Sequence, residues 1–125
     1  MPQYPEIYPT YIYLAEQLNK IGIAYIHLVD NSSMGISIAQ IELQKHIRVI
    51  FKNIIIIQGG YDKEKAEEDI ENGLGDLVAF GQPFINNPDL VERFKNDWPL
   101  SQDLKMDLFY SAEETGYTDY PFYKA

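Results

Sequence analysis

A chain of 125 residues, 46% hydrophobic and 23% charged, has the size and composition of one globular domain. Its net charge of −9 argues against nucleic acid and anionic membranes as partners, and the absence of cysteine excludes disulfides and thiolate chemistry. The start, MPQYPEIYP, lacks the basic region of a signal peptide, and no apolar run is long enough to cross a bilayer. These features predict a cytoplasmic protein.

Helical and strand-like patterns alternate along the chain. The expected elements are a helix capped by Thr10 and ending near Ile21, a strand at 23–30, a helix opening at Ser37, a strand in NIIIIQGGY, a helix from about Lys63, a strand in DLVAFG, and a helix starting at Asn87-Pro88-Asp89 with Asn87 as its cap. The run of four isoleucines is typical of a strand buried on both faces. From about residue 98 the sequence reads as an irregular aromatic tail.

This order is a βα repetition and predicts an α/β fold. Parallel strands joined by right-handed helical crossovers have all their carboxyl ends at one edge of the sheet. Doubly wound sheets and (β/α)₈ barrels both bind their ligands at that edge. We therefore expect the functional site to lie there.

Glycines follow two of the three expected strands. Gly59 and Gly60 end the second strand, and Gly81 ends the third. Backbone N–H groups at such bends, with a helix following, can bind a phosphate. The alternative, which the spacing leaves open, is that the glycines only permit tight turns. Gln82 offers a neutral donor next to Gly81, and neither bend places a Lys or Arg beside its glycines.

The other polar residues give weaker indications. His27 lies in an expected strand and His46 in an amphipathic helix, and we expect both to be structural. No spacing of His or carboxylate residues matches a metal site. Asp30, at the carboxyl end of the first strand, could reach a ligand or cap the following turn.

Two long stretches resemble a known family. NIIIIQGGYDKEKAEEDIENGLGDLVAFGQPFINNPDLVERF and LFYSAEETGYTDYP resemble the carboxyl-terminal end of the old yellow enzymes, FMN-dependent NAD(P)H oxidoreductases that reduce small activated alkenes. YLAEQLNKIGIAYIHLVD is similar to the preceding helix and strand. The resemblance implies that residues 1–125 form a single partial domain, corresponding to the last strands of a (β/α)₈ TIM barrel that this chain leaves incomplete.

The resemblance also implies roles for individual residues. Gly59 and Gly60 match the phosphate loop after the family's seventh strand, and Phe80, Gly81 and Gln82 match the loop after the eighth, where backbone amides meet the FMN phosphate. Phe109 matches a residue beside the flavin, and Tyr110 matches one at the substrate pocket. The family usually has arginine where Gln82 stands, so a charge-assisted contact worth about 1.5 to 3 kcal/mol is missing. No residue can be assigned as the proton donor.

Two functional hypotheses follow. The first is that the chain is the carboxyl-terminal portion of an FMN-dependent NAD(P)H:alkene oxidoreductase, inactive alone and completed by an amino-terminal polypeptide or by self-association. The second is a non-catalytic remnant or interaction module, favoured by the open edges of an incomplete sheet, which are prone to aggregation. An isolated phosphate-binding α/β module is a third possibility.

Overall fold

A computed structural model of the chain describes residues 5–29, 39–103, 105–108 and 114–124. The chain divides into two compact units, Met1–Ala79 and Phe80–Ala125, and each is presented by itself. None of the helices in the described ranges is long and apolar enough to cross a membrane.

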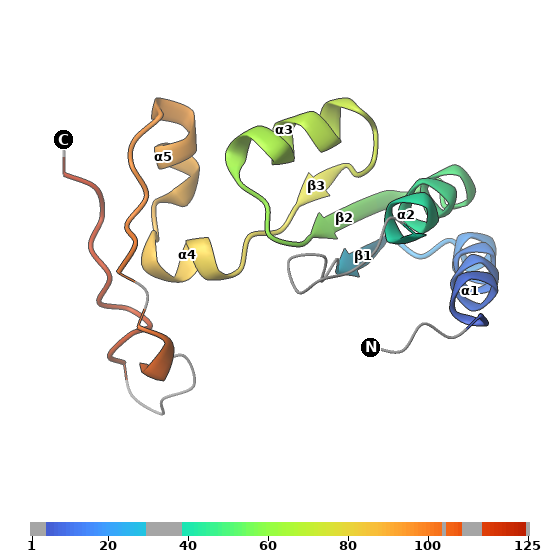
Figure 1. The fold of residues 1–125 in the computed structure, drawn as a ribbon, viewed down its shortest axis with the longest axis horizontal. Helices are drawn as coiled ribbons and strands as arrows, with labels where there is room; N and C mark the ends of the chain where they lie inside the picture. Colours follow the sequence, from blue (N-terminus) through green and yellow to red (C-terminus); the bar gives the residue numbers. More distant parts are fainter. Residues whose placement is uncertain (1–4, 30–38, 104, 109–113, 125) are drawn as a thin grey trace. The chain divides into compact units, whose positions relative to one another are not determined.

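The first unit contains the predicted βα repetition. Its elements are α1 (Ile7–Ile21), β1 (Tyr25–Val29), α2 (Ala39–Ile50), β2 (Ile54–Gln58), α3 (Lys63–Glu71) and β3 (Leu77–Val78), as Figure 1 shows. The strands form one parallel sheet in the order β1-β2-β3. Val29 pairs with Gln58 and Ile57 with Val78, so the carboxyl ends of all three strands lie at one edge. The predicted α/β class and parallel sheet are confirmed, and the part of the chain that the structure describes contains no closed barrel.

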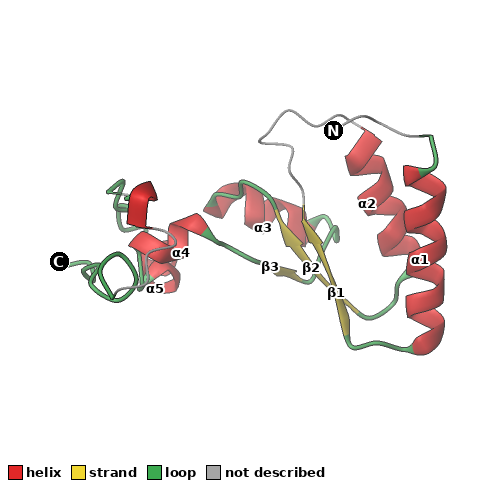
Figure 2. Cartoon of the chain, turned by 90° about the horizontal axis from the view of Figure 1, so that it is seen from below, coloured by secondary structure: helices red, strands yellow, loops and turns green. Residues whose placement is uncertain are grey.

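The core lies on one face of this sheet. Ile55 and Ile57 of β2 are fully buried against three residues of the helical layer. Ile47 belongs to α2, Phe51 directly follows α2, and Ala15 belongs to α1. Figure 2 shows α1 and α2 side by side next to the strands. Alternate residues of a strand face opposite sides, so the isoleucines at positions 55 and 57 point toward these helices.

The other face of the sheet carries apolar side chains that remain exposed. Tyr25, Ile54 and Leu77 have exposed fractions of 55%, 47% and 53%, and the strand register places them on the same face. The prediction that the isoleucine strand is buried on both faces is therefore wrong for the described residues. No element within the described ranges of the first unit covers this side.

Helix α1 starts earlier than predicted. It begins at Ile7 rather than after Thr10, because Pro9 falls in the first turn, where backbone N–H groups have no helical acceptor and a proline costs little. The predicted stop is confirmed, since Gly22 adopts the left-handed conformation with φ of 75°.

A side-chain clamp attaches β3 to β2. The Asp76 carboxylate accepts hydrogen bonds from the Ile55 backbone N–H at 2.8 Å and from Arg48 Nη1 at 2.7 Å. Arg48 Nη2 donates to the carbonyls of Phe51 and Asn53 at 2.8 and 3.1 Å. β3 has only two residues and so forms a short run of backbone pairing with β2. The clamp adds side-chain hydrogen bonds to this pairing.

The second unit contains α4 (Gln82–Asn86), α5 (Leu90–Asn96) and a 3₁₀ helix at Met106–Leu108. The sequence prediction missed α4, and it placed the start of the next helix too early. Asp89, not Asn87, is the N-cap residue of α5. The side chain of Asn87 is buried instead, donating to the Pro83 carbonyl at 2.9 Å and accepting from the Ser101 N–H at 2.7 Å. It joins α4 to the chain after α5.

The aromatic tail packs on α5. The Trp98 and Tyr123 rings are stacked with centroids 4.7 Å apart, and Tyr120 is buried. The tail thus buries Tyr120 and half-buries Tyr123, whereas Tyr117 and Phe122 remain exposed.

Candidate functional site

The glycine bend after β2 lies at the carboxyl edge of the sheet. Gly59 and Gly60 have φ angles of 154° and 59°, values that side chains disfavour, and Gly60 is exposed while Gly59 is half-buried. The Ala79 N–H donates to the Ile57 carbonyl at 2.9 Å, so the chain leaves β3 beside the end of β2. This confirms that the second and third strands end at one edge of the sheet.

Side chains of α3 hold the residues that follow the bend. The Tyr61 hydroxyl donates to Asp69 Oδ2 at 2.8 Å, and Lys65 Nζ lies 3.1 Å from the same oxygen. Asp62 caps α3 by accepting from the Lys65 backbone N–H at 2.9 Å. The sequence prediction missed Asp69, although its position three residues after the inward-facing Ala66 indicates that it shares the inner face of α3.

The second predicted loop belongs to the second unit. Gly81 and Gln82 are exposed, and Gly81 is the N-cap residue of α4, its carbonyl accepting from the Phe84 N–H at 3.0 Å. The Phe80 ring packs edge-on against Phe94 with centroids 5.2 Å apart. Pro83 supplies no N–H, so the backbone donors of this loop come from the residues before it. Phe109, Tyr110 and Asp30 lie outside the described residues.

Each taken by itself, the Gly59–Gly60 bend and the Gly81–Gln82 loop offer neutral donors to a phosphate. The bend at Gly59 and Gly60 has an accessible backbone, as has the loop at Gly81 and Gln82. The amino end of α3 is already capped by the carboxylate of Asp62, so a phosphate at the bend would rely on the glycine amides. None of these four residues carries a positive charge.

The two histidines have different surroundings. His46 Nδ1 shares a hydrogen bond of 2.8 Å with the Tyr8 hydroxyl, which joins α2 to α1 and gives this histidine a structural role. His27 is exposed on β1. Within the described ranges, no group of three or more His, Cys, Asp or Glu residues could hold a metal ion.

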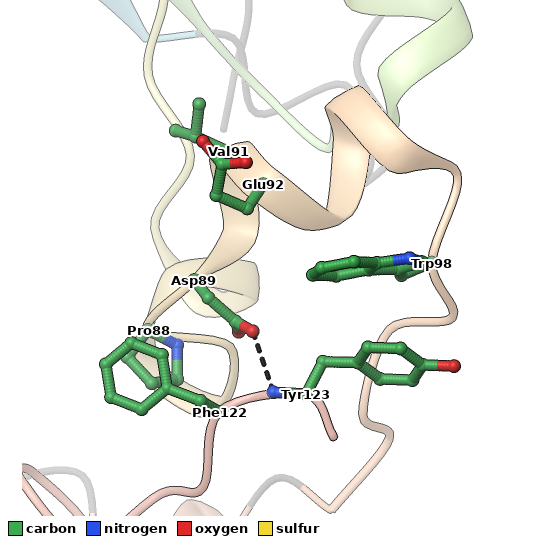
Figure 3. Close-up of a pocket in the computed structure, with 7 residues that line it drawn as sticks. All are labelled: Pro88, Asp89, Val91, Glu92, Trp98, Phe122 and Tyr123. Atoms are coloured by element: carbon green, nitrogen blue, oxygen red, sulfur yellow. Dashed lines mark hydrogen bonds between the residues drawn. The ribbon is translucent and has the colours of Figure 1, made fainter. Parts of the chain in front are cut away.

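A shallow pocket of about 410 Å³ lies within the second unit, between α5 and the tail (Figure 3). Its lining is mostly apolar and consists of Pro88, Asp89, Val91, Glu92, Trp98, Phe122 and Tyr123. Asp89 Oδ2 accepts from the Tyr123 N–H at 2.7 Å, and Asp89 Oδ1 accepts from Arg93 Nε at 2.6 Å. None of the predicted site residues lines this pocket.

The hydrogen bonds of Asp89 determine its ionisation. Burial by itself raises the pKa of this carboxyl, but donation from the Tyr123 N–H, from Arg93 and from its own backbone, together with the Arg93 charge, holds the pKa below its ordinary value. A carboxyl whose pKa is lower in the folded state stabilises the fold above its unfolded-state pKa. That contribution is lost as the pH falls through the folded-state value.

We expect the second unit to lose stability as the pH falls below about 4, the ordinary pKa of aspartate. Urea unfolding at pH 7, 5, 4 and 3, followed by the fluorescence of Trp98, the single tryptophan, measures the effect. The Asp89→Asn variant should be less stable at pH 7 and should depend less on pH in this range. Equal pH dependence in the two proteins would contradict the role of Asp89.

Comparison with known protein families gives an extended match. The family described as NADH:flavin oxidoreductase / NADH oxidase matches residues 6–101. The chain is 37% identical over 114 residues to 12-oxophytodienoate reductase 2 of Arabidopsis thaliana, covering 88% of this chain and 30% of that protein. It is 37% identical over 118 residues to 12-oxophytodienoate reductase 1 of Oryza sativa subsp. japonica, with the same two coverages.

Solved structures match over nearly the whole chain. Morphinone reductase superimposes with a TM-score of 0.87 and 36% identity, over 97% of this chain and 32% of that one. The old yellow enzyme of Trypanosoma cruzi gives a TM-score of 0.82 and 32% identity, over 96% of this chain and 31% of that one. The chain thus spans about 30% of the length of the relatives that it matches.

Proposed function

Because the chain belongs to the NADH:flavin oxidoreductase / NADH oxidase family, we propose that it supplies the FMN phosphate-binding loops of an FMN-dependent NAD(P)H:alkene oxidoreductase. The observation that carries this proposal is the accessible bend at Gly59 and Gly60, at the carboxyl edge of the sheet and next to the end of β3. Parallel α/β folds bind ligands at this edge.

The proposed task of these residues is to hold the cofactor. The amides at Gly59 and Gly60, and those at Phe80, Gly81 and Gln82, bind the phosphate, while Phe109 lies beside the flavin and Tyr110 at the substrate. FMN, when bound, supplies the hydride chemistry. The names of the relatives, 12-oxophytodienoate reductase and morphinone reductase, support a reduction, and the old yellow enzyme resemblance indicates a small activated alkene as the substrate.

A complementary polypeptide is the proposed partner. Tyr25, Ile54 and Leu77 expose apolar surface on one face of the sheet, and within the described residues β1 and β3 each pair with one strand only. A polypeptide carrying the part of the family fold that this chain does not span would cover that surface. A second copy of this chain is the alternative partner for that surface, although the net charge of −9 opposes the association of two copies. The chain alone is expected to be inactive, and the proposed location is the cytoplasm.

Reconstitution tests the proposal. The purified chain is mixed with FMN and with a polypeptide that carries the missing part of the family fold. Flavin absorbance after gel filtration and enone-dependent oxidation of NADPH and of NADH are then measured. We expect retained flavin and turnover in the mixture only. A Gly60→Val control should reduce flavin binding, because a β-branched residue disfavours a φ of 59°.

The outcomes separate the two hypotheses. A complex that forms without retaining flavin would support the non-catalytic interaction module, which the neutral Gln82 and the exposed sheet face favour. If neither flavin nor polypeptide binds, the oxidoreductase proposal for this chain is rejected.

A further inference from the structure

The bend at Gly59 and Gly60 presents a conformational problem. Glycine loses more backbone freedom on ordering than any other residue, so two consecutive glycines are a poor choice for a preformed ligand contact unless the neighbouring chain holds them. On the amino side the bend continues directly from Gln58, which is paired with Val29 in the sheet. On the carboxyl side it is followed by Tyr61.

Tyr61 is fixed at both its ring and its hydroxyl. The ring packs against the buried core cluster of the first unit. Nζ of Lys65, a residue of α3, lies 5.4 Å from the centroid of the Tyr61 ring. The hydroxyl donates to Asp69 Oδ2 at 2.8 Å. Asp69 has an exposed fraction of only 8%, and the same oxygen receives Lys65 Nζ at 3.1 Å. The carboxylate is therefore shielded from water and held in place by a charge from its own helix.

We infer that Tyr61, through its hydrogen bond to Asp69, is the positioning residue that sets the Gly59–Gly60 bend for binding an anion. The bond links the loop to a residue eight positions later, in the second half of α3, and so fixes the carboxyl end of the bend to a rigid element. A ligand that meets an ordered bend pays less conformational entropy on binding. The identity of the anion as the FMN phosphate rests on the proposed function, whereas the positioning of the bend does not.

Replacing the hydroxyl tests the inference with little change in packing. Tyr61→Phe keeps the ring in the core and removes the bond to Asp69. Tyr8→Phe is the matched control, because it removes one tyrosine hydroxyl bond of 2.8 Å, to His46, between other elements of the same unit. Asp69→Asn retains an acceptor for the Tyr61 hydroxyl. Its order parameters at the bend and its anion affinity are therefore expected to lie closer to those of the unchanged chain than the values of Tyr61→Phe do.

Backbone order is the first measurement. The ¹⁵N order parameters of Gly59, Gly60 and Tyr61 in the unchanged chain should be near 0.85, the value of a rigid backbone. In Tyr61→Phe they should fall toward about 0.6, the upper limit of flexible segments, and in Tyr8→Phe they should not change. If Tyr61→Phe and Tyr8→Phe give the same order parameters at the bend, the inference is overturned.

Anion affinity is the second measurement. Inorganic phosphate and FMN are titrated separately at constant ionic strength, with the amide shifts of Gly59 and Gly60 as the signal. Loss of one hydrogen bond predicts an affinity about 2- to 10-fold weaker in Tyr61→Phe than in Tyr8→Phe. Equal affinities overturn the link between positioning and binding. If neither the unchanged chain nor its mixture with the complementary polypeptide binds either anion while the order parameters still differ, the proposed function fails and the positioning of the bend by Tyr61 stands.

Discussion

Replacing Arg93 by alanine should lower the free energy of unfolding of the second unit by about 3 to 5 kcal/mol, the range for breaking a buried ion pair from one side. Arg93 has an exposed fraction of 4%. Its Nε donates to Asp89 at 2.6 Å, its Nη1 to the Pro99 carbonyl at 2.8 Å and its Nη2 to the Pro121 carbonyl at 3.4 Å. Its guanidinium also lies 5.6 Å from the Tyr123 ring centroid. One side chain thus joins α5 to two segments of the tail.

Urea unfolding followed by Trp98 fluorescence measures this loss, since Trp98 is stacked on Tyr123. Lys95→Ala is the control on the same helix, because the Lys95 side chain is 71% exposed and its ion pair with Glu92 is long, at 3.9 Å. The control should change stability by less than about 1 kcal/mol. Similar losses in the two variants would show that Arg93 does not hold the tail.

The Gln82→Arg variant should bind FMN about 10- to 150-fold more tightly than the unchanged chain. A charge-assisted contact to phosphate contributes about 1.5 to 3 kcal/mol, and each 1.4 kcal/mol is a factor of ten in affinity. Gln82 is exposed, so the longer side chain can be accommodated without repacking the second unit. Fluorescence titration of FMN, with the complementary polypeptide present if the chain alone binds too weakly, gives the ratio.

Gln102→Arg is the control for net charge. It makes the same substitution at another exposed glutamine of the second unit, outside the predicted loops. In a chain with a net charge of −9, any added arginine favours an anionic ligand to some extent. If both variants improve FMN binding equally, the effect is one of overall charge, and Gln82 does not contact the phosphate.

The sheet could be predicted because the sequence patterns that indicate its strands and helices lie within short stretches of the chain. The β-branched run at 54–57 and the helical spacing around it establish a βα repetition without knowledge of any distant contact. The helix end near Ile21 was correctly predicted for the same reason, because the left-handed Gly22 that follows Ile21 stops the helix through local conformation. The predicted roles of Gly59, Gly60, Gly81 and Gln82 stay predictions.

Contacts between residues far apart in the sequence were not predictable. Arg48 and Asp76 are 28 positions apart, and Asp89 and Tyr123 are 34 apart, so no window of sequence contains either pair. Asn87 shows how this misleads a local argument. Asn-Pro-Asp is a good helix start, but the buried amide forms bonds to Pro83 and Ser101, and the helix begins after Asp89. Tertiary hydrogen bonds outweighed the local capping preference.

The clamp on Asp76 has a consequence for how the first unit assembles during synthesis. The partners of Asp76 in the clamp are the Arg48 guanidinium and the Ile55 N–H, and β3 pairs with β2. All of these partners precede Asp76 in the chain. β2 likewise pairs with β1, which is made before it. β2 and β3 therefore each pair, on leaving the ribosome, with a strand that has already been translated, and the sheet can grow in the direction of translation.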